Sequence, residues 1–322
     1  MAFEELIGNR AAKERLLQMF ETKKIPGTLL LEGPSGVGKT LFALEFATML
    51  IGKNTKKNHA DIHHYRPEGK SGMHSMASMQ ELIKEVSLPP FESPYKVCII
   101  HEAERMLVTS SNALLKTLEE PPLNSVIILL SSEPKQLLPT IFSRCACIRF
   151  FPVPENEIAS WLISHQSKSA EEASKIALLS EGSLANATRL ASKPKEWQAF
   201  LVTLLSTKSQ EDRSFALSQL EASFSALKEE QEDKESSLEW IQEVDVLFEH
   251  ILLWYRDLHL LKENIPSSAL FYEEHKEDLK KISLSSLPPL EKIVTLIQEC
   301  REAVQSFMKL KNILEYFILK AF

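Results

Sequence analysis

A glycine-rich run, GPSGVGKT, occupies residues 33–40 and satisfies the pattern G-x-x-x-x-G-K-[ST] in full. The apolar stretch TLLLE precedes it, and an apolar segment with helical spacing follows it, which is the strand–loop–helix context that the motif requires. Glycines let the backbone wrap round phosphates, the lysine reaches the terminal phosphates, and the hydroxyl can ligate magnesium. We therefore expect a phosphate-binding loop made of Gly33, Pro34, Ser35, Gly36, Val37, Gly38, Lys39 and Thr40.

A second candidate for chemistry is VCIIHEAE at residues 97–104, where a buried strand would deliver His101 and Glu102 to a site. In nucleotide-hydrolysing proteins with such a loop, the first of these two positions normally holds magnesium through an aspartate, and a glutamate after it activates water. Magnesium prefers oxygen ligands, so an imidazole at position 101 is a poor substitute. These residues favour binding of a nucleotide with weak or absent hydrolysis, although Glu102 could still orient water.

The elements that must position these residues alternate along the first half of the chain. Strands are predicted at residues 28–32, 96–100, 125–132 and 145–151, and helices lie between them, whereas residues 53–74 are polar and predicted to form a loop. This alternation predicts an α/β fold with a parallel sheet and crossover helices.

After residue 152 only helical patterns remain, first as short helices over residues 155–193. From Leu290 onward we predict one long amphipathic helix that packs within its own domain. Its apolar stripe consists of Ile293, Leu296, Ile297, Val304, Phe307, Leu310, Leu314 and Phe317. Trp254 is predicted to be core, and the adjacent Arg256 and Asp257 are predicted not to face each other on their helix.

Composition narrows the class of protein. The 322 residues carry a net charge of −7, which argues against a freestanding basic nucleic-acid binder. No signal peptide or membrane-length apolar run is evident, and scattered cysteines indicate reduced thiols, so we expect a cytoplasmic protein. Residues 41–97 contain no cysteine, and histidines alone are a poor zinc site, so we predict neither zinc nor another protein-held metal. The cysteines are Cys98, Cys145, Cys147 and Cys300, and the histidines between the loop and the second strand are His59, His63, His64 and His74.

Three further stretches occur in order and at close spacing: NALLKTLEEPP at 112–122, LLSSEPKQLLPT at 129–140, and Ser143-Arg144-Cys145. Together with the loop they resemble the clamp-loader branch of the AAA+ ATPases, specifically bacterial DNA polymerase III clamp-loader subunits. The resemblance is dense over 1–152, weaker over 153–195, and limited to patches such as LLWYRDL (252–258) beyond. It implies an AAA+ nucleotide-binding core at 1–152, a small helical lid at 153–195 and an all-α collar for oligomerisation at 196–322.

The resemblance also implies roles for single residues. Arg144 would act as a finger on the nucleotide of a neighbouring subunit, with a structural salt bridge as the alternative. Ser131, or the adjacent Ser132, would be the sensor of the terminal phosphate, with a strand-end turn as the alternative. Ile7 would pack on the adenine, while Asn9 could cap the first helix.

Within this family the departures favour the delta-prime type over the motor-type gamma/tau subunits. His101 replaces the metal-holding acid, and the four-cysteine zinc module of the motor subunits is missing. In GSLANA, Ala185 stands where motor subunits place an arginine. Arg189, one helical turn further on, is either a partial substitute for that arginine or a simple surface arginine. The resemblance thus implies a subunit of the DNA polymerase III holoenzyme, with the gamma/tau and delta subunits, the sliding clamp and primed DNA as partners. ATP and magnesium are possible cofactors, and its own ATPase would be weak or absent. An active gamma/tau-like ATPase remains the alternative, and an unrelated P-loop kinase is a third, less favoured interpretation.

Overall fold

The computed structural model describes residues 3, 6–52, 59–67, 72–191, 196–207, 209–229, 234–266, 270–280, 282, 287–306 and 308–321. The chain divides into two units: residues 1–191 form the core unit, and residues 192–322 form the helical domain. The predicted nucleotide-binding core and most of the predicted lid both fall in the core unit. Each unit is described by itself.

Among the described residues of the core unit, five strands form one sheet in the order β2-β3-β4-β1-β5, and every neighbouring pair is parallel. β1, β3 and β4 are buried along their whole length, as expected for central strands of a sheet covered on both faces. The sheet therefore has the crossover architecture that the alternating sequence pattern predicts. The strands are β1 (Thr28–Glu32), β2 (Ile62–Tyr65), β3 (Lys96–Ile100), β4 (Ser125–Ser131) and β5 (Ala146–Arg149).

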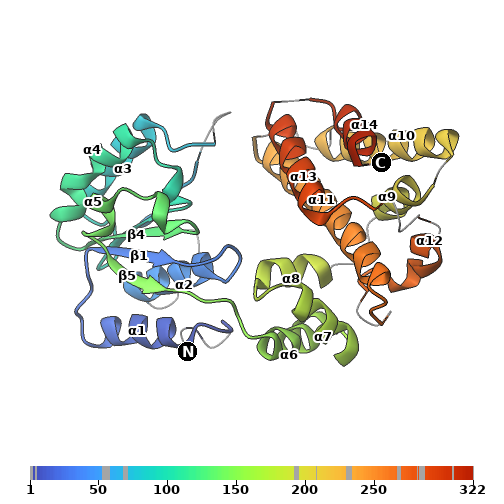
Figure 1. The fold of residues 1–322 in the computed structure, drawn as a ribbon. Coiled ribbons are helices and arrows are strands. Elements are labelled where there is room, and N and C mark those ends of the chain that lie inside the picture. Colours follow the sequence, from blue (N-terminus) through green and yellow to red (C-terminus); the bar gives the residue numbers. More distant parts are fainter. Residues whose placement is uncertain are drawn as a thin grey trace. The chain divides into compact units, whose positions relative to one another are not determined.

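Helices cover both faces of this sheet (Figure 1). Helix α1 (Arg10–Glu21) and helix α2 (Lys39–Ile51) bury their apolar stripes against one face, and α3 (Met76–Ser87), α4 (Val108–Glu119) and α5 (Pro139–Phe142) cover the other. Local sequence sets several helix boundaries. The Ser75 hydroxyl accepts a bond from the Ser78 N–H at the start of α3, and Gly52, with φ of 110°, ends α2.

The edge strand β2 corrects the sequence prediction, because residues 53–74 were expected to be a loop. Ile62 and Tyr65 are buried, while the two histidines between them are more exposed, so the segment has only two apolar residues to indicate a strand. An edge strand is held largely by its ladder to one neighbour, here β3, with Ile62 opposite Val97. Composition alone therefore missed it.

Three short helices complete the core unit: α6 (Glu155–Gln166), α7 (Ala170–Leu179) and α8 (Leu184–Ala191). We call these the lid helices. They share a small apolar core that includes Ile158, Leu162 and Ala173. Ser169 and Glu172 form a capping box at the start of α7, which satisfies two backbone N–H groups at that end.

The helical domain contains α9 (Glu196–Ser206), α10 (Gln210–Glu229), α11 (Lys234–Lys262), α12 (Lys276–Lys280), α13 (Leu290–Gln305) and α14 (Leu310–Ala321). Its core is built round Trp254, which is 1% exposed as predicted, together with Tyr255 and Phe248. With the fully parallel sheet of the core unit, this arrangement confirms the predicted fold class of an α/β core with crossover helices, a small group of helices after it and an all-α C-terminal domain.

The single long helix predicted from Leu290 onward is wrong, because the chain turns between α13 and α14. The Ser306 N–H bonds to the carbonyls of Glu302 and Ala303 and ends α13, and α14 then packs against α13. The interruption spans about one helical turn, so the apolar period stays in phase across it and hides the break. The stripe is buried in both helices as predicted, apart from Phe307, which lies outside the described residues.

The expectation for Arg256 and Asp257 is also wrong. The Arg256 Nη1 lies 3.0 Å from the Asp257 Oδ1, so the two neighbours form an ion pair. Asp257 is fully buried and also accepts a bond of 2.8 Å from the Tyr272 N–H. A buried carboxylate needs several donors, and that requirement outweighs the preference for partners three or four residues away.

Candidate nucleotide site

The loop at residues 33–40 joins β1 to α2 in a conformation that only glycine adopts readily. Gly33 has φ of 148°, and a Cβ there would lie 2.3 Å from the carbonyl oxygen of Phe150. Gly36 has φ of 76°, and a Cβ there would lie 2.0 Å from the Ser183 hydroxyl. The glycines of the motif thus serve both the turn and a close approach of neighbouring chain. Pro34, Ser35 and Gly38 complete the turn, whose other members are Val37, Lys39 and Thr40.

Lys39 lies inside this loop. Its Nζ donates to the carbonyl oxygens of Gly33 at 2.5 Å and Pro34 at 2.6 Å, and to the Ser132 hydroxyl at 3.1 Å. Burial lowers the pKa of Lys39 to about 8, and the nearby carboxylate of Glu104 opposes that shift. The ammonium is therefore held ready for an anion, with backbone carbonyls as its partners.

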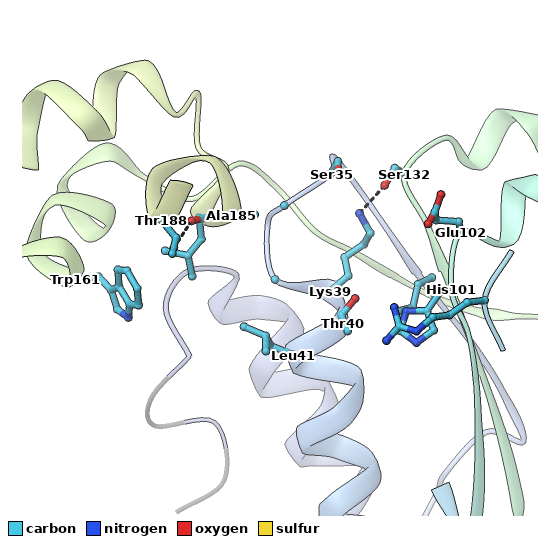
Figure 2. Close-up of a pocket in the computed structure, with 15 residues that line it drawn as sticks. Ser35, Lys39, Thr40, Leu41, His101, Glu102, Ser132, Trp161, Ala185 and Thr188 are labelled. Atoms are coloured by element: carbon cyan, nitrogen blue, oxygen red, sulfur yellow. Dashed lines mark hydrogen bonds between the residues drawn. The ribbon is translucent and has the colours of Figure 1, made fainter. Parts of the chain in front are cut away.

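A cavity of about 460 Å³ opens beside the loop. Figure 2 shows Lys39 reaching toward Ser132, with His101 and Glu102 on one side and lid residues on the other. The lid side is formed by Trp161 of α6 and by residues of α8. The lining residues are Ser35, Gly36, Gly38, Lys39, Thr40, Leu41, Arg66, His101, Glu102, Leu130, Ser132, Trp161, Leu184, Ala185 and Thr188.

His101 directly follows β3 and is 5% exposed. Its Nε2 lies 3.1 Å from the Nδ1 of His64, and its carbonyl oxygen lies 2.7 Å from the Nε2 of His74. Burial, together with the positive charge of Arg66 and the neighbouring imidazoles, lowers the pKa of His101 to about 3. At neutral pH the ring is uncharged and hydrogen-bonded to a second imidazole. It offers no oxygen ligand, and the donor set at this strand end does not fit magnesium.

The acidic residues after His101 lie in different surroundings. Glu102 has φ of 48°, is exposed, and pairs with Arg105 at 2.9 Å, although it still lines the cavity. Glu104 accepts a bond of 3.1 Å from the Ser132 N–H and so ties the end of β4 to the segment after β3. Sequence reasoning missed Glu104, although its place in the run HEAE marks it as a second acid near the strand end.

The lid contacts the loop through the backbone. The Ala185 N–H donates to the Gly36 carbonyl oxygen at 3.2 Å. Arg189 hydrogen-bonds to Asn186 on the same helix, and it is not among the residues that line the cavity. The position that lacks an arginine is therefore the one at which α8 meets the loop.

Two other predicted site residues do not line the large cavity, and their predicted roles stay predictions. Ser131 is 1% exposed, and its hydroxyl has no hydrogen-bond partner among the described residues, whereas Ser132 lines the cavity and meets Lys39. Ile7 packs against the apolar core of the lid helices rather than lining the large cavity.

Asn9 does not cap α1 with its side chain. Its Oδ1 accepts from the Phe151 N–H at 2.7 Å, while its Nδ2 donates to the Phe151 carbonyl at 3.1 Å and to the Val37 carbonyl at 3.5 Å. One amide therefore joins the start of α1, the phosphate loop, and the segment that leaves β5 for the lid.

Arg144 lies outside this cavity. Its guanidinium is 3.2 Å from Glu119 of α4 and 3.0 Å from the Thr140 carbonyl oxygen, and its side chain is 31% exposed. The partly exposed guanidinium is compatible with both interpretations made from sequence, the local salt bridge and the finger.

Metal and membrane expectations rest on the part of the chain that the structure describes. There, no three or more His, Cys, Asp or Glu side chains are placed so that they could hold a metal ion, and the absence of zinc stays a prediction. None of the helices in that part is both long and apolar enough to cross a bilayer. The four cysteines are free thiols.

Comparison with known proteins shows what this part of the chain resembles. Residues 8–154 match the family model described as DNA polymerase III, delta subunit. The delta-prime subunit of DNA polymerase III from Bacillus subtilis is 35% identical over 167 residues, which is 49% of this chain and 50% of the relative. Over residues 8–154 this chain therefore resembles the clamp-loader subunits of DNA polymerase III.

Other curated proteins match a similar share of the chain. Replication factor C small subunit 1 from Pyrobaculum islandicum is 30% identical over 163 residues, covering 50% of this chain and 47% of the relative. The tau subunit of DNA polymerase III from Bacillus subtilis is 30% identical over 159 residues, which is 44% of this chain and 28% of the relative. The chain spans about half the length of the first curated relatives that it matches, and the family model covers residues of the core unit.

Proposed function

We propose that this chain is a delta-prime-type subunit that works in a clamp loader with gamma/tau and delta subunits and helps to place a sliding clamp on primed DNA in the cytoplasm. Its own site binds ATP through the loop at residues 33–40 and hydrolyses it slowly or not at all. The observation that supports this proposal is His101, a buried and neutral imidazole at the strand end where a hydrolysing site holds its metal.

The described residues divide the work of such a site. The loop N–H groups and Lys39 would hold the phosphates, and Ser132, hydrogen-bonded to Lys39, would contact the terminal one in the sensor role first assigned to Ser131. Glu102, whose Oε2 pairs with Arg105 at 2.9 Å, would be the residue that orients a water molecule. Bound magnesium would supply charge neutralisation at the phosphates, and the residues at the end of β3 do not provide for it.

Steady-state ATP hydrolysis by the purified chain, with and without DNA and clamp, tests this proposal. We expect a rate no higher than that of Lys39→Ala, which removes the ammonium from the loop. A rate well above this control, lost in Glu102→Gln, would instead establish a gamma/tau-like ATPase.

We propose further that Arg144 acts on the nucleotide of a neighbouring subunit. A guanidinium suits the spread charge of a phosphoryl group in transit, and fingers of this kind raise rates by about 10³- to 10⁵-fold in other nucleotide hydrolases. The salt bridge to Glu119 offers a matched control, because Glu119→Ala removes the same ion pair and keeps the arginine.

In a reconstituted loader, Arg144→Ala should permit assembly, reduce ATP hydrolysis at one neighbouring site and slow clamp loading, while Glu119→Ala should load clamps as the wild type does. The loss should be partial, because other subunits supply their own fingers. Equal effects of the two variants would leave the salt bridge as the role of Arg144.

A further inference from the structure

Arg66 is a cation of the cavity that sequence reasoning missed. It directly follows β2, and the carboxyl ends of β2 and β3 meet at the same edge of the sheet because the two strands are parallel. Arg66 lines the cavity together with His101, Thr40 and Lys39. Its charge is close enough to lower the pKa values of both His64 and His101. The guanidinium therefore belongs to the strand end where a magnesium site would otherwise lie.

The charges around this end favour an anion over a metal ion. Glu102 is the single carboxylate among the described lining residues, and it already pairs with Arg105. Glu104 accepts from the Ser132 backbone instead of lining the cavity. Thr40 supplies a hydroxyl, but the imidazole of His101 is occupied by His64. A divalent cation placed here would meet a guanidinium and few oxygen ligands.

We propose that Arg66 takes the charge-neutralising place of magnesium, so that this site binds a nucleoside triphosphate or diphosphate without a divalent metal ion. Arginine is charged at every accessible pH, and its planar fork matches two phosphate oxygens at once. Lys39 and Arg66 then approach the phosphate chain from β1 and β2, respectively. The proposal rests on nucleotide binding as proposed above and deepens it.

His101 has a defined part in this arrangement. An aspartate at that position would pair with Arg66 and withdraw it from the phosphates, because opposite charges in a partly buried site attract strongly. The neutral imidazole, held by His64, leaves the guanidinium available. The replacement that weakens hydrolysis thus also enables metal-free binding.

The test is isothermal titration of the full chain with ATP and with ADP, each in excess EDTA and in excess magnesium. We expect the wild type to bind ATP with the same affinity in both buffers. Arg66→Ala should weaken binding about 10- to 100-fold in EDTA, the loss of one charge-assisted contact. Arg66→Lys, which keeps the charge without the fork, should fall between the two. Arg15→Ala removes an equal charge from the exposed face of α1, and this variant should bind ATP as the wild type does.

Three outcomes would overturn the inference. If ATP binding required magnesium, a metal ion would be part of the site. If Arg66→Ala bound ATP with wild-type affinity, Arg66 would not contact the nucleotide. In either case the proposed nucleotide binding stands. Absence of ATP and ADP binding by the folded wild type in both buffers would overturn nucleotide binding itself, and the inference with it. Thermal melting of each variant, expected to match the wild type because Arg66 is exposed, separates lost binding from lost folding.

Discussion

The ends of β1 and β3 lie at the same edge of one sheet and differ in what they retain. At the end of β1 the strained glycines, the buried lysine and the following helix form a complete phosphate loop. At the end of β3 the metal-holding acid is replaced by an imidazole bonded to another imidazole, and Glu102 pairs with Arg105. Under the proposed function, binding would depend on the end of β1 and hydrolysis on the end of β3, so that one could be lost while the other stays.

The largest expected effect comes from breaking the β1 end through its backbone. Gly33→Ala would place a Cβ 2.3 Å from the backbone oxygen of Phe150, which cannot move without shifting β5. We expect a loss of about 2–4 kcal/mol in the free energy of unfolding of the core unit, together with loss of ATP binding. Urea denaturation measures the first and titration the second.

Gly52→Ala provides the matched control for that change. Gly52 also has a positive φ, of 110°, but a Cβ there would meet nothing within 4 Å. For Gly52→Ala the free energy of unfolding should fall by only about 1 kcal/mol, which is the cost of a positive φ for alanine. ATP binding should be kept. Equal destabilisation by the two variants would show that the contact with Phe150 is unimportant.

Restoring the β3 end should make the two ends alike. His101→Asp adds an oxygen ligand near Thr40, and we expect magnesium to raise the ATP affinity of this variant by about tenfold or more. The wild type should show no such gain. Titration in magnesium and in EDTA decides the matter, and His101→Asn, which adds a neutral oxygen, should respond less. A full magnesium effect in the wild type would contradict the proposed role of His101.

A smaller effect concerns pH at the β1 end. Burial lowers the pKa of Lys39 to about 8, so the loop loses its positive charge as pH rises through that value, and ADP affinity should fall by up to about tenfold per unit beyond it. Without ligand the sign is reversed. Between about 8 and 10.5 the unfolded chain binds the extra proton, so the stability of the core unit should rise with pH. Titration with ADP at several pH values checks the fall in affinity, with Lys116→Ala on the exposed face of α4 as the control. Urea denaturation checks the rise in stability. A flat affinity profile would contradict the lowered pKa.

The smallest effect is expected away from both ends. Arg144→Ala removes a partly exposed ion pair, and such pairs contribute about 0–1 kcal/mol, so the isolated chain should unfold almost as the wild type does. Glu119→Ala should match it in the same denaturation experiment. A loss of several kcal/mol for Arg144→Ala alone would show that this arginine supports the fold in a way that its contacts do not reveal.

Residues that act through local rules were predictable from the sequence. The loop glycines, the central strands and the helix breaks at prolines all follow from neighbours in the chain, and the structure contains them as expected. Residues that reach the site through tertiary packing were not. Arg66 was missed because β2 is a short edge strand with two histidines, and Trp161 was missed because only the packing of the lid brings it to the cavity.

The same distinction explains the errors in the helical domain. The turn between α13 and α14 preserves the apolar period, so periodicity could not reveal it. Arg256 and Asp257 pair because Asp257 is fully buried and needs hydrogen-bond donors, which their spacing in the sequence does not reveal. Of the two serines named for the sensor, Ser132 lines the cavity and Ser131 does not, because side chains alternate in direction at a strand end.

The amide of Asn9 gives the core unit a mechanical property. Because it bonds to the N–H and to the carbonyl of Phe151 and also to the Val37 carbonyl, it links the segment leading to the lid with the phosphate loop and the start of α1. A carboxylate of the same size would lose the two donated bonds and keep the accepted one. Asn9→Asp would therefore cut the side-chain link between the loop and the segment after β5 and leave the bond from the Ala185 N–H to the Gly36 carbonyl oxygen as a link between the lid helices and the loop.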